Sequence, residues 1–225
     1  MSPPAGLAAE SLMLQGPAGA LEARVDFPAA AGTGAGPWTP TACAVVCHPH
    51  PLFGGTLTNK VVHTLARTFN DAGMPSLRFN FRGVGASAGI HDGGPGEVRD
   101  ALAAVGYCRE RWPHARPWLA GFSFGAAVAV LASAQVRPAG LVLVAPAVDR
   151  LDLGGVAPEC PWLVLYGDAD EVVQPARMLE WARNLQPQPT VQVMPGAGHY
   201  FHGRLPQLRD AVTVFVNENQ RPGKT

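Results

Sequence analysis

The chain lacks an excess of charge of either sign: among its 225 residues, 17 basic residues balance 17 acidic ones. Without a basic stripe, no electrostatic attraction to nucleic acid or to an anionic membrane is expected. Its apolar runs all fall short of the roughly 18–20 residues that a membrane span needs. We therefore expect neither a nucleic acid nor a membrane as a partner.

Cysteine is also scarce, and the four cysteines form no CxxC pair and no regular spacing. This pattern argues against a disulfide framework and indicates free, buried thiols in a reducing compartment. The N-terminal stretch has no basic head followed by a long apolar run, the pattern of a secretory signal. We expect a cytoplasmic protein.

The composition itself is that of an ordinary globular protein, with 47% apolar and 15% charged residues. No internal repeat and no long linker divides the chain. A chain of this length removes enough surface from water to be stable without disulfide or metal staples. We expect one domain over residues 1–225.

Hydrophobic periodicity predicts the order of the elements. Two short β-like segments, 11–15 and 20–27, come first, and a Gly/Pro/Ala-rich stretch over 28–40 indicates a surface loop. From residue 41 on, strands and helices alternate. The expected strands are 41–48, 75–81, 116–122, 139–146, 160–167 and 190–196. The expected helices are 59–73, 96–112, 124–136, 175–185 and 206–219.

Nearly continuous apolar strands separated by helices are typical of a parallel sheet covered on both faces. The predicted fold class is therefore α/β, with a mostly parallel central sheet that begins with antiparallel N-terminal strands. Such sheets bind ligands outside the C-terminal ends of their strands. Functional residues are expected just after each strand.

A glycine-flanked serine follows the strand 116–122 and precedes the helix 124–136, in the sequence Gly-Phe-Ser-Phe-Gly. A serine at a sharp strand-to-helix turn needs small neighbours, which Gly121 and Gly125 supply. The helix N-terminus behind it favours the anion formed during acyl transfer. We predict Ser123 as a catalytic nucleophile, against the plainer interpretation of a serine that caps a glycine-rich turn.

An acid and a base follow in the order expected for this sheet topology, Ser…Asp…His. Asp168, Asp170 and Glu171 all follow the strand 160–167, and position alone does not separate them as the acid that orients an imidazole. His199 follows the last strand in a glycine-rich loop and is the predicted base. His202 is its nearby rival.

The segment CHPHPLFGGT at the end of the strand 41–48, together with FNFRGVGAS and the serine turn, resembles the α/β-hydrolase superfamily from about residue 41 to the end of the chain. More narrowly, it resembles small lid-free bacterial serine hydrolases grouped with dienelactone hydrolases. Dienelactone hydrolases proper use cysteine as the nucleophile, so the serine here argues against that activity.

The resemblance implies roles for further residues. The pattern G-x-x-D-x-x-V, matched by Gly167, Asp170 and Val173, makes Asp170 the acid. The backbone N–H groups of Phe124 and of the His48-Pro49-His50 segment would form an oxyanion hole. Pro51 has no N–H, so the first donor is His50 or Leu52.

A zinc site at His48 and His50 lacks a third ligand at a useful spacing, so we expect no metal and no cofactor. A turn-stabilising or substrate-facing role for this pair fits better. Arg82 and Gly83 indicate a structural turn, and HDGGPGE, around His91 and Asp92, indicates a mobile loop at the rim of the site.

Only residues 147–159 separate the strands 139–146 and 160–167, which leaves no room for a cap domain. The site should therefore be open, with an apolar rim. The expected rim residues are Leu52, Phe53, Phe122, Phe124, Tyr200 and Phe201. Of these, the predicted substrate contacts are Phe53, Phe122 and Tyr200.

We expect a serine hydrolase that cleaves small, soluble, short-acyl carboxylic esters through an acyl-enzyme intermediate. A thioesterase, an amidase or an acyltransferase with the same triad remains an alternative. A non-catalytic binding protein on the same scaffold is a further one. The expected partner is a small ester, and monomer and homodimer both stay open.

Overall fold

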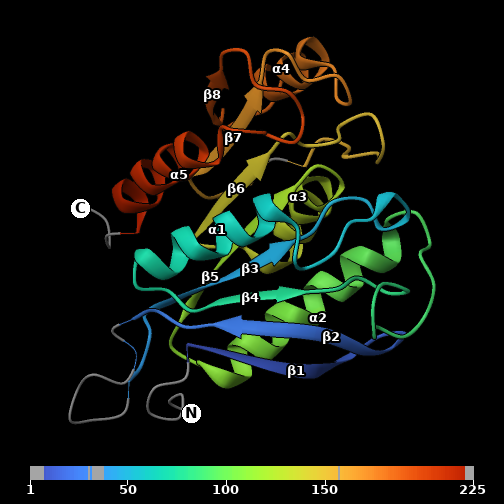
Figure 1. Ribbon diagram of the computed structural model, residues 1–225, viewed down its shortest axis with the longest axis vertical. Helices are drawn as coiled ribbons and strands as arrows, with labels where there is room; N and C mark the ends of the chain where they lie inside the picture. Colours follow the sequence, from blue (N-terminus) through green and yellow to red (C-terminus); the bar gives the residue numbers. More distant parts are fainter. Residues whose placement is uncertain (1–7, 30, 32–37, 157, 221–225) are drawn as a thin grey trace.

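The computed structural model describes residues 8–29, 31, 38–156 and 158–220. Eight strands form one sheet in the order β1-β2-β4-β3-β5-β6-β7-β8, with β1 and β8 at its two edges (Figure 1). The strands are β1 Ala9–Gly16, β2 Gly19–Asp26, β3 Ala42–Cys47, β4 Ser76–Phe79, β5 Arg116–Phe122, β6 Gly140–Val144, β7 Trp162–Gly167 and β8 Thr190–Met194.

The sheet is mostly parallel with an antiparallel beginning, as the sequence predicts. β1 and β2 form a hairpin, and β2 pairs antiparallel with β4. Every pairing from β4 across to β8 is parallel. The surface loop predicted for residues 28–40 lies mostly outside the described residues. That residues 1–225 form a single domain stays a prediction.

Helices cover both faces of the sheet (Figure 1). One face packs against α1 and α5, and the other against α2, α3 and α4, through two separate apolar clusters. The helices are α1 Lys60–Asp71, α2 Pro95–Arg111, α3 Phe124–Val136, α4 Pro175–Arg183 and α5 Leu205–Asn219, with a short 3₁₀ turn at Pro51–Phe53.

The central strand β5 shows how the pattern sets these layers. Side chains of a strand alternate between the two faces of a sheet. Trp118, Ala120 and Phe122 accordingly belong to the cluster under α1 and α5, whereas Leu119 belongs to the opposite cluster. Since both faces are buried, β5 is apolar along almost its whole length.

Among the residues that the structure describes, none forms a cap over the C-terminal ends of the strands. Between β6 and β7, the described residues of 145–161 contain neither helix nor strand. The edge at which β3, β5, β7 and β8 end is therefore left uncovered by that connection, as the sequence predicts. Within the described part of the chain, no helix is both long and apolar enough to cross a membrane.

Candidate active site

The turn from β5 into α3 holds Ser123 in a left-handed backbone conformation, with φ 56° and ψ −118°. This conformation is strained for a residue other than glycine, and such strain is concentrated at functional sites. A Cβ on Gly121 would overlap the carbonyl of Gly125, and a Cβ on Gly125 would overlap the carbonyl of His48. Both glycines are therefore required by close backbone packing, as the sequence pattern indicates.

The structure brings together the three residues predicted as nucleophile, base and acid. His199 Nε2 lies 3.1 Å from Ser123 Oγ, and His199 Nδ1 lies 2.8 Å from Asp170 Oδ2. All three are nearly buried, with exposed fractions of 7% for the serine, 2% for the histidine and 8% for the aspartate. These two hydrogen bonds form a continuous chain from hydroxyl to imidazole to carboxylate.

Asp170 is held as an ionised acceptor. Burial acts to raise its pKa, but the hydrogen bond from His199 and those from the N–H groups of Val173 and Val172 outweigh burial and lower the pKa below its ordinary value. An ionised carboxylate only accepts hydrogen bonds, so Nδ1 of His199 must carry the proton. Nε2 is then free to accept the Ser123 hydroxyl proton.

The two other acids of this loop bind the segment that carries His199. Asp168 Oδ1 accepts a hydrogen bond of 2.6 Å from the Gly196 N–H. Glu171 Oε2 accepts one of 3.1 Å from the His199 N–H. The alternatives left open by the sequence are thus separated by contacts: only Asp170 reaches the imidazole. The positioning contacts of Asp168 and Glu171 are tertiary and had no sequence signal.

Of the backbone donors expected around an oxyanion, Phe124 directly follows Ser123, and the His48 carbonyl, two residues before His50, lies against Gly125. Among the hydrogen bonds of the described residues, none uses the N–H of His50 or of Phe124 as donor. The Leu52 N–H, in contrast, donates to His50 Nδ1 at 3.2 Å. This engagement favours His50 over Leu52 as the first donor, and the role of either stays a prediction.

His48 stabilises the turn after β3. Its ring is fully buried, its Nε2 accepts from the Phe81 N–H at 3.0 Å, and its Nδ1 lies 2.6 Å from the Pro49 carbonyl. Burial lowers its pKa to about 4, against the hydrogen bond to Pro49. Because both ring nitrogens are engaged, His48 is unsuited as a metal ligand. Across the described ranges, no cluster of three or more His, Cys, Asp or Glu residues could hold a metal.

The predicted rim needs correction. Leu52, Phe53 and Tyr200 are exposed, at 72%, 73% and 48%. Phe122 is completely buried, so its assignment as a substrate contact is wrong. As the last residue of β5 it points to the face occupied by Trp118 and Ala120, and its ring packs 5.0 Å from the His199 ring. Phe124 and Phe201 are likewise buried rather than exposed at the rim.

Arg82 has the structural role that the sequence indicates. Its guanidinium binds both carboxylate oxygens of Asp100, with Nε 3.0 Å from Oδ2 and Nη2 2.7 Å from Oδ1. Its backbone N–H also donates to Oδ2 at 3.0 Å. The following residue, Gly83, has φ 73°, as expected for a turn. This bidentate, buried pair fixes the segment after β4 to α2.

The HDGGPGE segment is tethered to α2 rather than being the mobile loop that we predicted. The buried carboxylate of Glu97 accepts from His91 Nδ1 at 2.9 Å and from the Gly94 N–H at 2.8 Å. Pro95 at the first helical position and Glu97 at the third are a helix-start signal. That signal was present in the sequence and would have predicted the tether.

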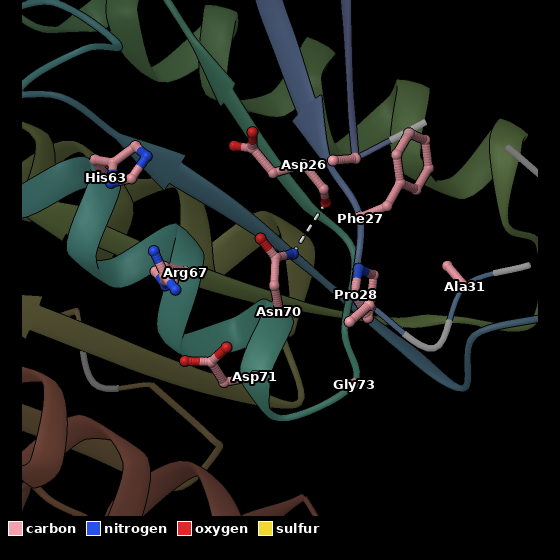
Figure 2. Close-up of a pocket in the computed structure, with 11 residues that line it drawn as sticks. Asp26, Phe27, Pro28, Ala31, His63, Arg67, Asn70, Asp71 and Gly73 are labelled. Carbon is pink, nitrogen blue, oxygen red and sulfur yellow. Dashed lines mark hydrogen bonds between the residues drawn. The ribbon is translucent and has the colours of Figure 1, made fainter. Parts of the chain in front are cut away.

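A cavity of about 700 Å³ lies elsewhere in the molecule, between the end of β2 and the end of α1 (Figure 2). Asn70 points across it and donates to the Asp26 carbonyl at 2.9 Å. Asp26 pairs with Ser76, the first residue of β4, so this cavity is at the end where the parallel strands begin. Ser123 follows the opposite end, where ligands bind in such sheets.

Comparisons with known proteins agree with this fold. A family model described as "Serine aminopeptidase, S33" matches residues 40–158. An uncharacterized protein of Rickettsia prowazekii is 34% identical over 184 residues, covering 77% of each chain.

Solved structures extend the likeness to nearly the whole chain. An α/β serine hydrolase without lid from Xanthomonas campestris is 39% identical, with a TM-score of 0.88 over 99% of this chain and 100% of the other. A serine hydrolase homologue from Coxiella burnetii is also 39% identical, with a TM-score of 0.85 over 91% of this chain and 96% of the other. Est1E from Butyrivibrio proteoclasticus, with ferulic acid bound, shares the fold at 20% identity, with a TM-score of 0.80 over 94% of this chain and 100% of the other.

Proposed function

The chain belongs to the lid-free α/β serine hydrolases, in the family described as serine aminopeptidase S33, and we propose that it cleaves small carboxylic esters through an acyl-enzyme on Ser123. The observation that carries this proposal is the pair of hydrogen bonds joining Ser123, His199 and Asp170. Nucleophile, base and orienting acid stand at hydrogen-bonding distance before any substrate is bound.

In the first half of the proposed reaction, Ser123 Oγ attacks the ester carbonyl carbon while His199 Nε2 takes the hydroxyl proton. The imidazolium that results is stabilised by the ionised Asp170. His199 then gives the proton to the departing alkoxide, the C–O bond breaks, and the alcohol leaves. The acyl group remains on Ser123 as an ester.

In the second half, water takes the place of the alcohol. His199 removes a proton from the water, the hydroxide adds to the acyl carbon, and Ser123 leaves with the proton returned by His199. Acid product and free enzyme result. The N–H groups of Phe124 and His50 would stabilise the oxyanion in both halves. Each donor would lower the activation free energy by about 3–4 kcal/mol.

A preference for short acyl chains is supported by the absence of a cap and by the exposed rim residues Leu52, Phe53 and Tyr200. An open, shallow site covers little of a long alkyl chain, so additional methylenes gain little burial. Small soluble esters therefore fit this site better than lipid aggregates.

The proposal is tested by pre-steady-state hydrolysis of p-nitrophenyl butyrate. An acyl-enzyme that forms faster than it breaks down releases a burst of p-nitrophenol with an amplitude equal to the enzyme concentration. Loss of the burst and of turnover in Ser123→Ala is expected. Slow turnover that this variant retains would favour a non-catalytic binding protein with incidental esterase activity.

Amide hydrolysis is the second candidate, because the matching family model is described as an aminopeptidase. The same serine, histidine and aspartate serve both reactions, so the substrate decides. We expect aminoacyl p-nitroanilides to be cleaved far more slowly than p-nitrophenyl esters of the same acyl group, beyond the intrinsic difference in reactivity. Comparable kcat/KM values on both series would favour the peptidase.

A further inference from the structure

Four aromatic rings form a cluster next to Ser123, from here on the ring cluster: His50, Phe53, His91 and Phe124. The His50 ring is at its centre, with centroids 4.7 Å from Phe53, 4.9 Å from His91 and 5.0 Å from Phe124. The rings of His91 and Phe124 lie 5.6 Å apart. All of these distances are within the range of favourable aromatic pairs.

The ring cluster extends from the nucleophile to the surface. Phe124 directly follows Ser123 and is buried, His50 and His91 are half-buried, and Phe53 is 73% exposed. Aromatic surface is therefore accessible at His50, His91 and Phe53, and the buried Phe124 ring packs against both histidines. A substrate group that leaves the reacting carbonyl on this side would lie against ring faces and edges.

The rings are fixed before any substrate binds. His91 is held through Nδ1 by Glu97, a carboxylate with no exposed surface that also accepts the Gly94 N–H. His50 is held through Nδ1 by the Leu52 N–H at 3.2 Å. A pre-organised surface loses little side-chain entropy on binding, which improves affinity.

The central ring is uncharged near neutral pH. Burial lowers the pKa of His50, and the nearby His91 and Arg150 lower it further. A neutral imidazole flanked by two phenyl rings can pack against an aromatic partner by its face or its edge. The exposed Phe53 ring would gain most from such a partner, because it has the most surface to remove from water.

We propose that the ring cluster is a substrate subsite that selects esters carrying an aromatic ring, by packing that ring against Phe53 and the half-buried His50, which the buried Phe124 ring supports. This inference rests on the proposed esterase function and adds a substrate class to it. Aromatic packing beyond simple area burial corresponds to about a three- to ten-fold preference over a saturated ring of the same shape.

The test compares substrates that differ only in the aromaticity of one ring. Methyl phenylacetate is paired with methyl cyclohexylacetate for the acyl side, and benzyl acetate with cyclohexylmethyl acetate for the alcohol side. In both pairs the ring is insulated from the carbonyl by a methylene group. The ratio of kcat/KM within a pair therefore reports ring recognition rather than reactivity.

In the wild type, at least one ratio should be about three to ten, and Phe53→Leu should bring it to about one. Turnover of the saturated ester is measured in the same variant, so that a general loss of activity, which lowers both rates, is separated from a loss of the ratio. Val214→Ala serves as the control, because Val214 is an exposed apolar residue of α5, at 58%. This control should leave both ratios unchanged.

Two results would overturn the subsite. One is a ratio near one for both pairs in the wild type while the saturated esters are still hydrolysed. The other is loss of the ratio in Tyr200→Leu but not in Phe53→Leu, which would put aromatic recognition at Tyr200. Absence of turnover on every ester would instead contradict the proposed function itself.

Discussion

Asp168 and Asp170, two residues apart in one loop, bind the two ends of the segment that carries the histidine. Asp168 accepts from the Gly196 N–H, and Asp170 accepts from the His199 ring. The first contact is made to backbone and the second to the imidazole. The same loop therefore positions the base and orients it, through different carboxylates.

This division predicts opposite outcomes for two matched variants. Asp170→Asn should lower kcat on p-nitrophenyl butyrate by about 10⁴-fold, because an amide cannot fix the tautomer and charge of His199 as a carboxylate does. Asp168→Asn keeps an oxygen to accept the Gly196 N–H, so it should cost at most about 1 kcal/mol of stability and little activity.

Melting curves of both variants are the folding control for this comparison. His199→Ala should be about as inactive as Asp170→Asn, and the double variant hardly worse, because such residues act as a unit. An inactive Asp168→Asn beside a healthy Asp170→Asn would show that the acid is assigned two residues too far along the chain.

Local patterns predicted most of the fold and the centre of the site. The helix 124–136 and the strand 116–122 were predicted with the bounds that the structure shows, since a long apolar strand and a small-residue helix leave few alternatives. Ser123 was predicted because its turn depends on two glycines close in sequence. The order of the later strands then left the acid open among Asp168, Asp170 and Glu171, and left His202 as a rival of His199 as the base.

What the sequence missed depends on contacts between distant segments or on side-chain direction. Asp168 contacts Gly196 and Glu171 contacts His199, each 28 positions further along the chain. The periodicity of a sequence does not predict contacts between such distant residues. Phe122 was predicted to be one of the apolar residues at the rim. The alternation of β5, with Phe122 in phase with Trp118 and Ala120, would have put it in the core.

Because His48 is buried as a neutral ring, we expect the protein to lose stability in mild acid. Its pKa is about 4 in the folded protein, against an ordinary value of 6.5. As the pH falls, the unfolded chain therefore binds this proton first, and the folded state loses stability between about pH 6.5 and 4. The loss of stability from this residue is at most about 3–4 kcal/mol, and it is absent well above pH 6.5.

The measurement is the free energy of unfolding by urea at several pH values between 7 and 4. His48→Gln retains one donor and one acceptor but does not titrate, so its free energy should fall less steeply than that of the wild type. His114→Gln, at an exposed position, is the control and should keep the wild-type slope. Equal slopes in all three proteins would show that His48 is not buried as a neutral ring.

Metal chelators should leave activity unchanged. The proposed mechanism draws its nucleophile from Ser123 and its base from His199, so no metal-activated water is required. Both ring nitrogens of His48 are also engaged in hydrogen bonds. Hydrolysis of p-nitrophenyl acetate before and after dialysis against EDTA checks this. Inactivation that zinc reverses would instead support a metal site at His48 and His50.

Acyl-chain length should matter because no cap covers the site. Along a series of p-nitrophenyl esters from acetate to palmitate, kcat/KM should fall beyond medium chains, by roughly ten-fold or more at the longest. Activity should not rise abruptly when a substrate exceeds its solubility. A preference for emulsified long-chain triglyceride would refute the open-site account.

The most direct test of Ser123 as the nucleophile is to label the protein with a fluorophosphonate and to locate the adduct by peptide mass spectrometry. We expect one adduct per chain, on Ser123, formed together with complete loss of esterase activity. Ser123→Ala should not be labelled, and its kcat should be lower by about 10⁵–10⁶-fold at an unchanged melting temperature. An adduct on another residue, or an active and folded Ser123→Ala, would contradict the assignment.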